Sequence, residues 1–292
     1  MGIGEQFRAY CSNLNMLPTS TISSRYAAIT RRLNTDFWVT NSSSAHSLYV
    51  GSYGRNTSIR GASDIDVLFW LPWSLFRQYD EYVGNGQSQL LQAIRNSLLC
   101  TYSTTRVRGD GQIVCVPFSD GMTIEVLPAF DFDDGSFYYP DTNSGGSWKT
   151  TDPRKEIGVM RVRSLATNGN LVNLCRMVRD WKRTHSIAMS GILIDTLAYQ
   201  FIATWAYRDK SYLYYDWMTR DFFSYLYGLD TTQTYWSAPG SGRRVYRTGQ
   251  FRVPAKHAYE MACDAIDSES RGYHYTAAGK WRDLYSTSFP CP

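Results

Sequence analysis

Residues 48–69 constrain the fold and the chemistry of this chain more than any other stretch. They read Leu-Tyr-Val-Gly-Ser-Tyr-Gly-Arg-Asn-Thr-Ser-Ile-Arg-Gly-Ala-Ser-Asp-Ile-Asp-Val-Leu-Phe. This order predicts the end of a strand, a turn at Gly51 and Ser52, a short helix, and a second strand that carries Asp64 and Asp66. Because side chains alternate across a strand, both carboxylates are expected on one face, with the apolar residues beside them in the core.

The two predicted features of this stretch suit a nucleotide and a metal ion. Two carboxylates on one face repel each other and lose hydration, so we expect a bound cation, and hard oxygen ligands suit Mg²⁺. The Gly51-Ser52 turn lets backbone N–H groups approach a phosphate, and the following helix would point its N-terminus at that anion. A Gly-Ser pair alone is a common loop, but a Ser-Asp-Ile-Asp-Val-Leu run starting eleven residues after the serine is far more specific. The combination is typical of nucleotidyl transfer.

The composition agrees with a soluble enzyme but does not select one. The 292 residues are 43% hydrophobic and 19% charged, enough for two lobes or one large domain. The net charge of +4 is compatible with a nucleotide or RNA ligand without requiring one. The six cysteines have no CxxC spacing, which argues against a disulfide or zinc framework. Without a signal peptide or an apolar run that could cross a bilayer, we expect a cytoplasmic protein with no membrane contact.

A third acidic residue is predicted to join the aspartate pair. The pattern predicts helices over residues 1–35 and a later helix whose buried stripe is Leu90, Leu91, Ile94 and Leu98. It then predicts strands at 105–108, 112–118 and 122–127. In the last strand Glu125 faces the side opposite to Ile124 and Val126. Placed beside the aspartate strand, Glu125 would complete a cluster of three carboxylates.

The second half is predicted to be mostly helical. Residues 131–153 are rich in Asp, Gly, Ser and Pro, so we expect a loop and a domain boundary there, with a core lobe at 1–153 and a helical lobe at 154–292. Arg176 and Arg179 lie opposite the apolar stripe of a helix, which by spacing alone fits a solvated surface and a binding role equally well. Residues 236–251 are predicted to be an exposed basic loop, and a solvated surface is favoured over a nucleic-acid groove at 243–252.

Several motifs resemble those of the bacterial cGAS/DncV-like nucleotidyltransferases (CD-NTases), a family within the polymerase-β-like superfamily. The most specific are Gly51-Ser-Tyr-Gly-Arg-Asn-Thr-Ser-Ile59, Ser63-Asp-Ile-Asp-Val-Leu68 and Ile124-Glu-Val-Leu-Pro-Ala-Phe130. Supporting matches follow at Trp148-Lys-Thr-Thr-Asp-Pro153, Leu174-Cys-Arg-Met-Val-Arg-Asp-Trp-Lys182, Gly191-Ile-Leu-Ile-Asp-Thr-Leu197 and Lys280-Trp-Arg-Asp-Leu-Tyr285. The resemblance therefore covers almost the whole chain.

This resemblance implies an α/β (α+β) bilobal enzyme, with a mixed-sheet nucleotidyltransferase core, a helical C-terminal lobe and the active site in the cleft between them. Gly51 and Ser52 would hold the donor triphosphate, together with Arg176 and Arg179, although lysine is usual at position 179. Asp64, Asp66 and Glu125 would be the catalytic residues and would hold two Mg²⁺ ions, or Mn²⁺, although aspartate is usual at position 125.

The substrates implied by the resemblance are nucleoside triphosphates: ATP, GTP or a pyrimidine NTP. Such enzymes join them into cyclic di- or trinucleotides in the anti-phage systems called CBASS, and a separate effector reads the product. We expect the protein to act as a monomer.

Two other functions remain open from the sequence. The first is a template-independent polymerase that extends an RNA end, or a synthase of linear oligonucleotides, whose products would be sensitive to phosphatase. The second is a sensor that binds a nucleotide or RNA without turnover. An intact Gly-Ser turn beside three acids argues against the sensor, because binding alone does not require three adjacent carboxylates.

Overall fold

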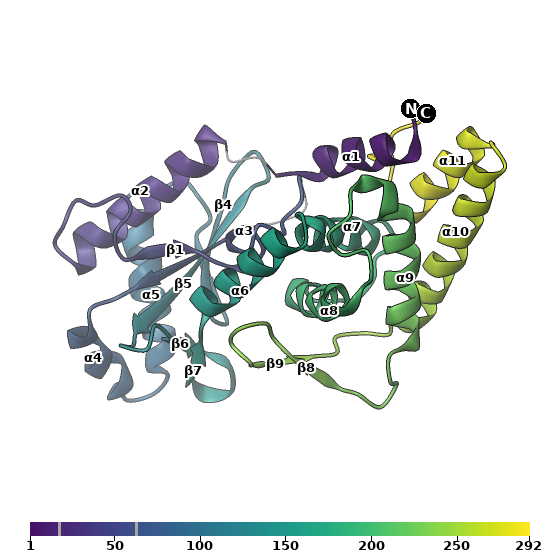
Figure 1. Cartoon of the computed structure of the whole chain (residues 1–292). Helices are drawn as coiled ribbons and strands as arrows, with labels where there is room; N and C mark the ends of the chain where they lie inside the picture. Colours follow the sequence, from purple (N-terminus) through teal and green to yellow (C-terminus); the bar gives the residue numbers. More distant parts are fainter. Residues whose placement is uncertain (17–18, 62–63) are drawn as a thin grey trace. The chain divides into compact units, whose positions relative to one another are not determined.

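The computed structural model describes residues 1–16, 19–61 and 64–292 and divides them into two compact units. The sheet unit comprises Leu17–Gly54 and Asp64–Ile157, and the helical unit comprises Met1–Met16, Arg55–Ser63 and Gly158–Pro292. The helices and strands of both units are labelled in Figure 1. None of the helices in the described ranges is both long and apolar enough to cross a membrane.

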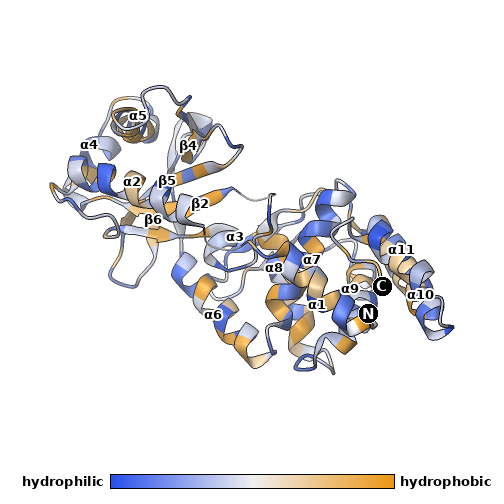
Figure 2. Cartoon of the chain, turned by 90° about the horizontal axis from the view of Figure 1, so that it is seen from above, coloured by the Kyte–Doolittle hydropathy of each residue, from blue (hydrophilic) through white to orange (hydrophobic). Residues whose placement is uncertain are grey.

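The sheet unit is built on one mixed sheet of seven strands. The strands are β1 (Ser47–Tyr49), β2 (Ile65–Trp70), β3 (Arg108–Asp110), β4 (Ile113–Pro117), β5 (Thr123–Asp131), β6 (Phe137–Asp141) and β7 (Ser147–Thr151). Their order is β1-β2-β5-β4-β3, and β6 pairs with both β5 and β7. The β2–β5 pair is parallel and the other pairs are antiparallel. In Figure 2, hydrophobic residues cover most of β2.

Two of the four helices described in the sheet unit, α2 and α5, begin at a capping side chain. The four helices are α2 (Ser20–Phe37), α3 (Gly51–Gly54), α4 (Phe76–Asp80) and α5 (Gly86–Leu99), with a 3-10 turn at Trp73–Leu75. The Thr19 hydroxyl accepts a hydrogen bond from the Ile22 N–H, and the Asn85 side chain accepts one from the Ser88 N–H. The four apolar residues predicted as the stripe of α5 are all buried, which confirms that prediction.

The helical unit contains six complete helices and the second half of a seventh among its described residues. They are α1 (Ile3–Leu14), α6 (Pro153–Ala166, which begins in the sheet unit), α7 (Asn170–Thr184), α8 (Gly191–Thr204), α9 (Tyr215–Gly228), α10 (Arg252–Ser270) and α11 (His274–Leu284), with a 3-10 turn at Tyr212–Tyr214. The two chain ends lie beside each other (Figures 1 and 2), where the rings of Phe7 and Phe289 are 5.1 Å apart.

The division into units differs from the predicted lobes at both ends of the core. Helix α1 belongs to the helical unit because its apolar side, including Phe7 and Tyr10, is fully buried in that unit's core. The Tyr10 hydroxyl also donates to Asp180 on α7, at 2.7 Å. Residues 55–61 belong to the helical unit too, and α6 passes from one unit to the other between Ile157 and Gly158.

Two predicted loops are wrong. Residues 131–153 form β6, β7 and a 3-10 turn at Asn143–Gly145. The residues rich in Asp and Gly form only the turns between the strands. Residues 236–251 include a hairpin of β8 (Tyr235–Ser237) and β9 (Arg244–Tyr246). Trp236 and Val245 are register partners there, and both are buried. Packing of these two apolar side chains stabilises a hairpin although the turn between them is basic and rich in glycine.

Asp216 on α9 gives a prediction about stability. Burial raises the pKa of this carboxyl from its ordinary value to about 6. The folded chain therefore holds this proton more tightly than the unfolded chain, and the stability this provides is lost as the pH rises from about 4 to about 6. We expect Asp216→Asn to raise the free energy of unfolding by about 2 kcal/mol at pH 7.5 and by much less at pH 4.

Denaturant unfolding at the two pH values measures this effect. The control is Asp209→Asn, because Asp209 is an exposed aspartate of the same unit. Equal stability of wild type and Asp216→Asn at pH 7.5 would show that the buried carboxylate is not destabilising.

Candidate active site

The predicted acids lie on adjacent parallel strands of the sheet unit. Asp66 on β2 and Glu125 on β5 are register partners, so their side chains project from the same face of the sheet. Asp64 immediately precedes β2 and is exposed, whereas Asp66 and Glu125 are half-buried. The flanking residues Ile65, Val67, Ile124 and Val126 are buried, as strand alternation predicts.

This row continues across the sheet with two residues that the sequence reasoning did not single out. Glu125 is the register partner of Cys115 on β4, and Cys115 is the register partner of Arg108 on β3. A carboxylate pair, a thiol and a guanidinium therefore follow one another on four adjacent strands. Strand alternation gave the face of Glu125, but no local signal in the sequence gives the register of β3, β4 and β5.

The environment of Glu125 opposes its ionisation. Burial and the charges of Asp66 and Asp64 raise the pKa of Glu125 to about 7, and Arg108 offsets only part of this effect. Burial and the nearby Glu125 also raise the pKa of the Cys115 thiol. A side chain that is crowded by negative charge and partly removed from water gains more from a bound cation than an ordinary surface carboxylate does.

The Gly51-Ser52 turn packs directly against the aspartate strand. Gly51 has a φ of +58°, and a Cβ added there would lie 1.8 Å from Oδ2 of Asp66. The Val50 N–H donates to the Asp66 carbonyl at 2.9 Å, which fixes the turn on β2. Only glycine therefore allows this approach. Because α3 has just four residues, a phosphate bound at this turn would contact Ser52 and backbone groups rather than a long helix dipole.

The three acids suit a divalent ion by their chemistry. Among residues 1–16, 19–61 and 64–292, no three His, Cys, Asp or Glu side chains are already gathered as a finished metal site. Asp64, Asp66 and Glu125 nevertheless supply hard oxygen atoms and a surplus of negative charge, and the raised pKa of Glu125 reflects its burial and then that surplus. They fit Mg²⁺ or Mn²⁺, and their assignment as metal ligands stays a prediction.

The raised pKa of Glu125 predicts how metal binding depends on pH. Binding to a carboxylate requires its ionised form, so below about pH 7 a proton must first leave Glu125. We expect the Mn²⁺ affinity to fall by up to about 10-fold for each pH unit below 7 and to level off above it. Calorimetry of Mn²⁺ binding with a non-hydrolysable ATP analogue, at pH 6, 7 and 8, measures this dependence.

Glu125→Gln tests whether the dependence comes from Glu125. This variant should bind Mn²⁺ more weakly at pH 8 and should lose most of the change in affinity between pH 6 and 7. An unaltered pH dependence in the variant would show that another group accounts for it.

The two predicted arginines belong to the helical unit, where their surroundings differ. Arg179 donates to both carboxylate oxygens of Asp195, at 2.6 and 2.9 Å, and to the carbonyls of Cys175 and Gly191. Although burial favours a lower pKa for Arg179, the Asp195 charge raises it above its usual value. These contacts favour a structural position for Arg179, and its predicted contact with phosphate remains untested.

Arg176 is less well satisfied. It is 7% exposed, its Nη2 donates to Oδ1 of Asn56 at 2.8 Å, and its buried Nε has no hydrogen-bond partner within the described chain. Burial lowers the pKa of this guanidinium. A buried cation with one neutral partner is costly, so an anion would stabilise it.

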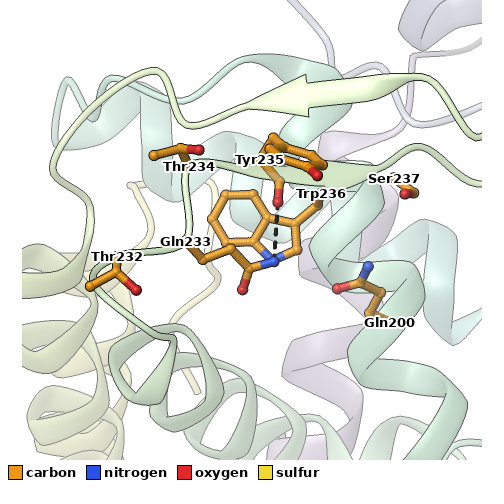
Figure 3. Close-up of a pocket in the computed structure, with 7 residues that line it drawn as sticks. All are labelled: Gln200, Thr232, Gln233, Thr234, Tyr235, Trp236 and Ser237. Carbon is orange, nitrogen blue, oxygen red and sulfur yellow. Dashed lines mark hydrogen bonds between the residues drawn. The ribbon is translucent and has the colours of Figure 1, made fainter.

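A pocket of about 480 Å³ in the helical unit is separate from these residues (Figure 3). Residues from β8 and the segment before it surround it together with α8, and Gln233 donates to the Tyr235 carbonyl at 3.1 Å. Its lining consists of Gln200, Thr232, Gln233, Thr234, Tyr235, Trp236 and Ser237. None of the predicted site residues lines it.

The parallel β2–β5 pair, its acids and the Gly-Ser turn form an arrangement that fits nucleotidyl transfer. Residues 1–163, more than half of the chain, match the model of a protein family. That family is described as "Second Messenger Oligonucleotide or Dinucleotide Synthetase domain" (SMODS). The chain belongs to this family, which contains the CD-NTases, and the predicted family, fold class and enzyme class are confirmed.

Similar proteins agree with this placement. A probable cyclic nucleotide synthase (IK1_05630) from Bacillus cereus (strain VD146) is 22% identical over 275 residues, covering 82% of this chain and 81% of the relative. The structure of CdnC from E. coli MS115-1 with ATP matches with a TM-score of 0.67 at 15% identity, covering 98% of both chains. The structure of CdnG from Bradyrhizobium diazoefficiens with GTP matches with a TM-score of 0.68 at 10% identity, covering 96% of this chain and 95% of the other.

Proposed function

We propose that this enzyme joins nucleoside triphosphates into a cyclic di- or trinucleotide second messenger and that it requires Mg²⁺. The observation that carries the proposal is the pairing of Asp66 with Glu125 on parallel strands, with the Asp66 carboxylate against the Gly51 turn. This arrangement puts acidic oxygens next to a glycine turn, as the reaction requires. The family description and the relative named as a probable cyclic nucleotide synthase support the cyclic product.

Each residue of the site has a proposed role. Gly51 and Ser52 bind the donor triphosphate, and Arg176 neutralises part of its charge. Asp64 and Asp66 would hold both metal ions, and Glu125 would hold one of them. Bound divalent ions would lower the pKa of the acceptor ribose hydroxyl and neutralise the charge of the leaving pyrophosphate.

We also propose that Glu125 takes the proton of the acceptor hydroxyl. The acceptor hydroxyl must lose a proton as it attacks the α-phosphorus of the donor, and the bond to pyrophosphate breaks. The Glu125 carboxylate would take this proton, directly or through a water molecule. A second, equivalent displacement would close the linear product into a ring.

Product analysis tests this function directly. The purified protein is incubated with the four labelled NTPs and Mg²⁺ or Mn²⁺, and the products are treated with phosphatase and identified by mass spectrometry. We expect pyrophosphate release and a phosphatase-resistant cyclic product that requires the metal. A phosphatase-sensitive product would instead indicate a linear oligonucleotide synthase, and nucleotide binding without pyrophosphate release would indicate a sensor.

We further propose that the product serves anti-phage signalling through a separate effector. The support comes from similar proteins: one CdnE, from Capnocytophaga granulosa, is described as a STING-associated c-di-GMP synthase, and CdnC is described in a complex with HORMA-deltaN. Cells that carry this gene with its genomic neighbours should restrict phage plating, and the same cells with Asp66→Asn should not. Equal plating in both strains would contradict the anti-phage role.

A further inference from the structure

The segment that follows the phosphate turn is tied into the helical unit by a buried carboxylate. Asp195 on α8 is fully buried and accepts hydrogen bonds from Arg55 Nε at 2.8 Å and from the Thr57 hydroxyl at 3.0 Å. It also pairs with Arg179. Although burial would raise the pKa of Asp195, the charges of Arg179 and Arg55 lower it to about 2. Asp195 is therefore an ionised anchor for both neighbours of residue 56.

Asn56 lies between these two anchored residues and has an unusual backbone conformation. Its φ is +60°, in the left-handed region that Asn tolerates better than most residues do. Its side chain is exposed, whereas Arg55 and Thr57 on either side are buried. The anchoring of both neighbours fixes the direction in which the Asn56 side chain projects.

The side-chain oxygen Oδ1 of Asn56 accepts a hydrogen bond from Arg176 Nη2 at 2.8 Å. Among the described residues Arg176 has no carboxylate partner, and its buried Nε has no hydrogen-bond partner. Asp195 instead forms ion pairs with Arg55 and Arg179. The three buried arginines thus divide into two that share one carboxylate and one that is held only by a neutral amide. The neutral amide orients the guanidinium without cancelling its charge.

We propose that Asn56 is a positioning residue that holds Arg176 ready for the donor triphosphate and, by being neutral, leaves its charge for that anion. This proposal rests on the proposed function, in which Arg176 binds the triphosphate. It explains why an amide rather than a carboxylate stands opposite a buried arginine, where an ion pair would be more stable in the free protein.

Asn56→Asp separates this role from a purely structural one. Aspartate has nearly the same shape and also tolerates positive φ, so the contact with Arg176 would become an ion pair. If Asn56 only stabilises the fold, the variant should be as stable as wild type, or more so, with an unaltered KM. If Asn56 keeps Arg176 free for phosphate, the variant should again be at least as stable, but its KM for NTP should rise about 10-fold or more, with kcat within about 3-fold of wild type.

The experiment compares KM, kcat and Tm for wild type, Asn56→Asp, Arg176→Gln and the double variant. Because the effect runs through Arg176, we expect Asn56→Asp to raise KM by less than about 3-fold when added to Arg176→Gln. The matched control is Asn168→Asp, since Asn168 is exposed in the same unit and has a φ of +52°. Its KM should equal that of wild type.

The possible results separate the role of Asn56 from the proposed binding of triphosphate by Arg176. A raised KM for Arg176→Gln with an unaltered KM for Asn56→Asp would overturn the role of Asn56 and leave the triphosphate role of Arg176 intact. An unaltered KM for Arg176→Gln would overturn both roles. If Asn56→Asp raised KM by the same factor in the wild-type and Arg176→Gln backgrounds, Asn56 would not act through Arg176.

Discussion

Asp66→Asn is expected to reduce pyrophosphate release by at least about 1,000-fold, because one of the central oxygen ligands loses its charge. The same change should stabilise the metal-free protein. The Asp66 charge is one of the causes that raise the pKa of Glu125, so at pH 8 the two ionised carboxylates repel each other in the folded chain. Loss of activity together with a higher Tm would exclude misfolding as the cause. The measurements are a coupled pyrophosphate assay and thermal unfolding with EDTA.

Asp110→Asn is the matched control for this prediction. The Asp110 charge also raises the pKa of Glu125, but Asp110 is exposed on β3 and has no proposed role in metal or nucleotide binding. Its removal should relieve some repulsion while leaving turnover near the wild-type level. If Asp66→Asn kept a tenth or more of the wild-type turnover, the catalytic assignment of the aspartate strand would be refuted.

Gly51→Ala should have the second largest effect, a loss of turnover of about 100-fold or more. The new methyl group would lie 1.8 Å from Oδ2 of Asp66, so the turn or the carboxylate must move. Either movement would separate the backbone proposed to bind phosphate from the oxygen proposed to bind metal. The positive φ of Gly51 adds strain of about 1 kcal/mol for alanine. We expect kcat to fall as well as substrate affinity, because both parts of the site depend on this contact.

Gly121→Ala separates the two causes. Gly121 lies in the same unit with a φ of +85°, and a Cβ there would meet nothing within 4 Å. It therefore carries the backbone strain without the collision. This variant should lose a similar amount of stability and keep its turnover. If both glycine variants lost activity equally, general destabilisation rather than contact with Asp66 would be responsible.

The sequence predicted those parts of the site that depend on local periodicity. Residues 64–67 and 123–126 alternate polar and apolar side chains, and this pattern alone placed Asp66 and Glu125 on the faces opposite their buried neighbours. The parallel pairing that makes them adjacent required the family resemblance, because two short strands contain no signal for their register. Helix α5 was predictable for the same local reason, through its apolar stripe.

The errors arise where contacts distant in sequence decide the structure. Strands β6 and β7 were missed because their turns contain many Asp, Gly and Ser residues. Phe137 is buried in a cluster with Val50, Leu68 and Ala129, of which Val50 and Leu68 are distant in sequence. The β8–β9 hairpin was missed for a similar reason. The role of Asn56 could not be predicted from the sequence, because it depends on a hydrogen bond with Arg176, which is 120 residues away.

The most direct test of the central claim is a crystal structure with Mn²⁺ and a non-hydrolysable ATP analogue, in which anomalous scattering locates the metal. We predict Mn²⁺ bound to carboxylate oxygens of Asp64, Asp66 and Glu125, with the triphosphate against Gly51 and Ser52. Manganese bound elsewhere, or Glu125 turned away from an ion held by the aspartates, would contradict the account.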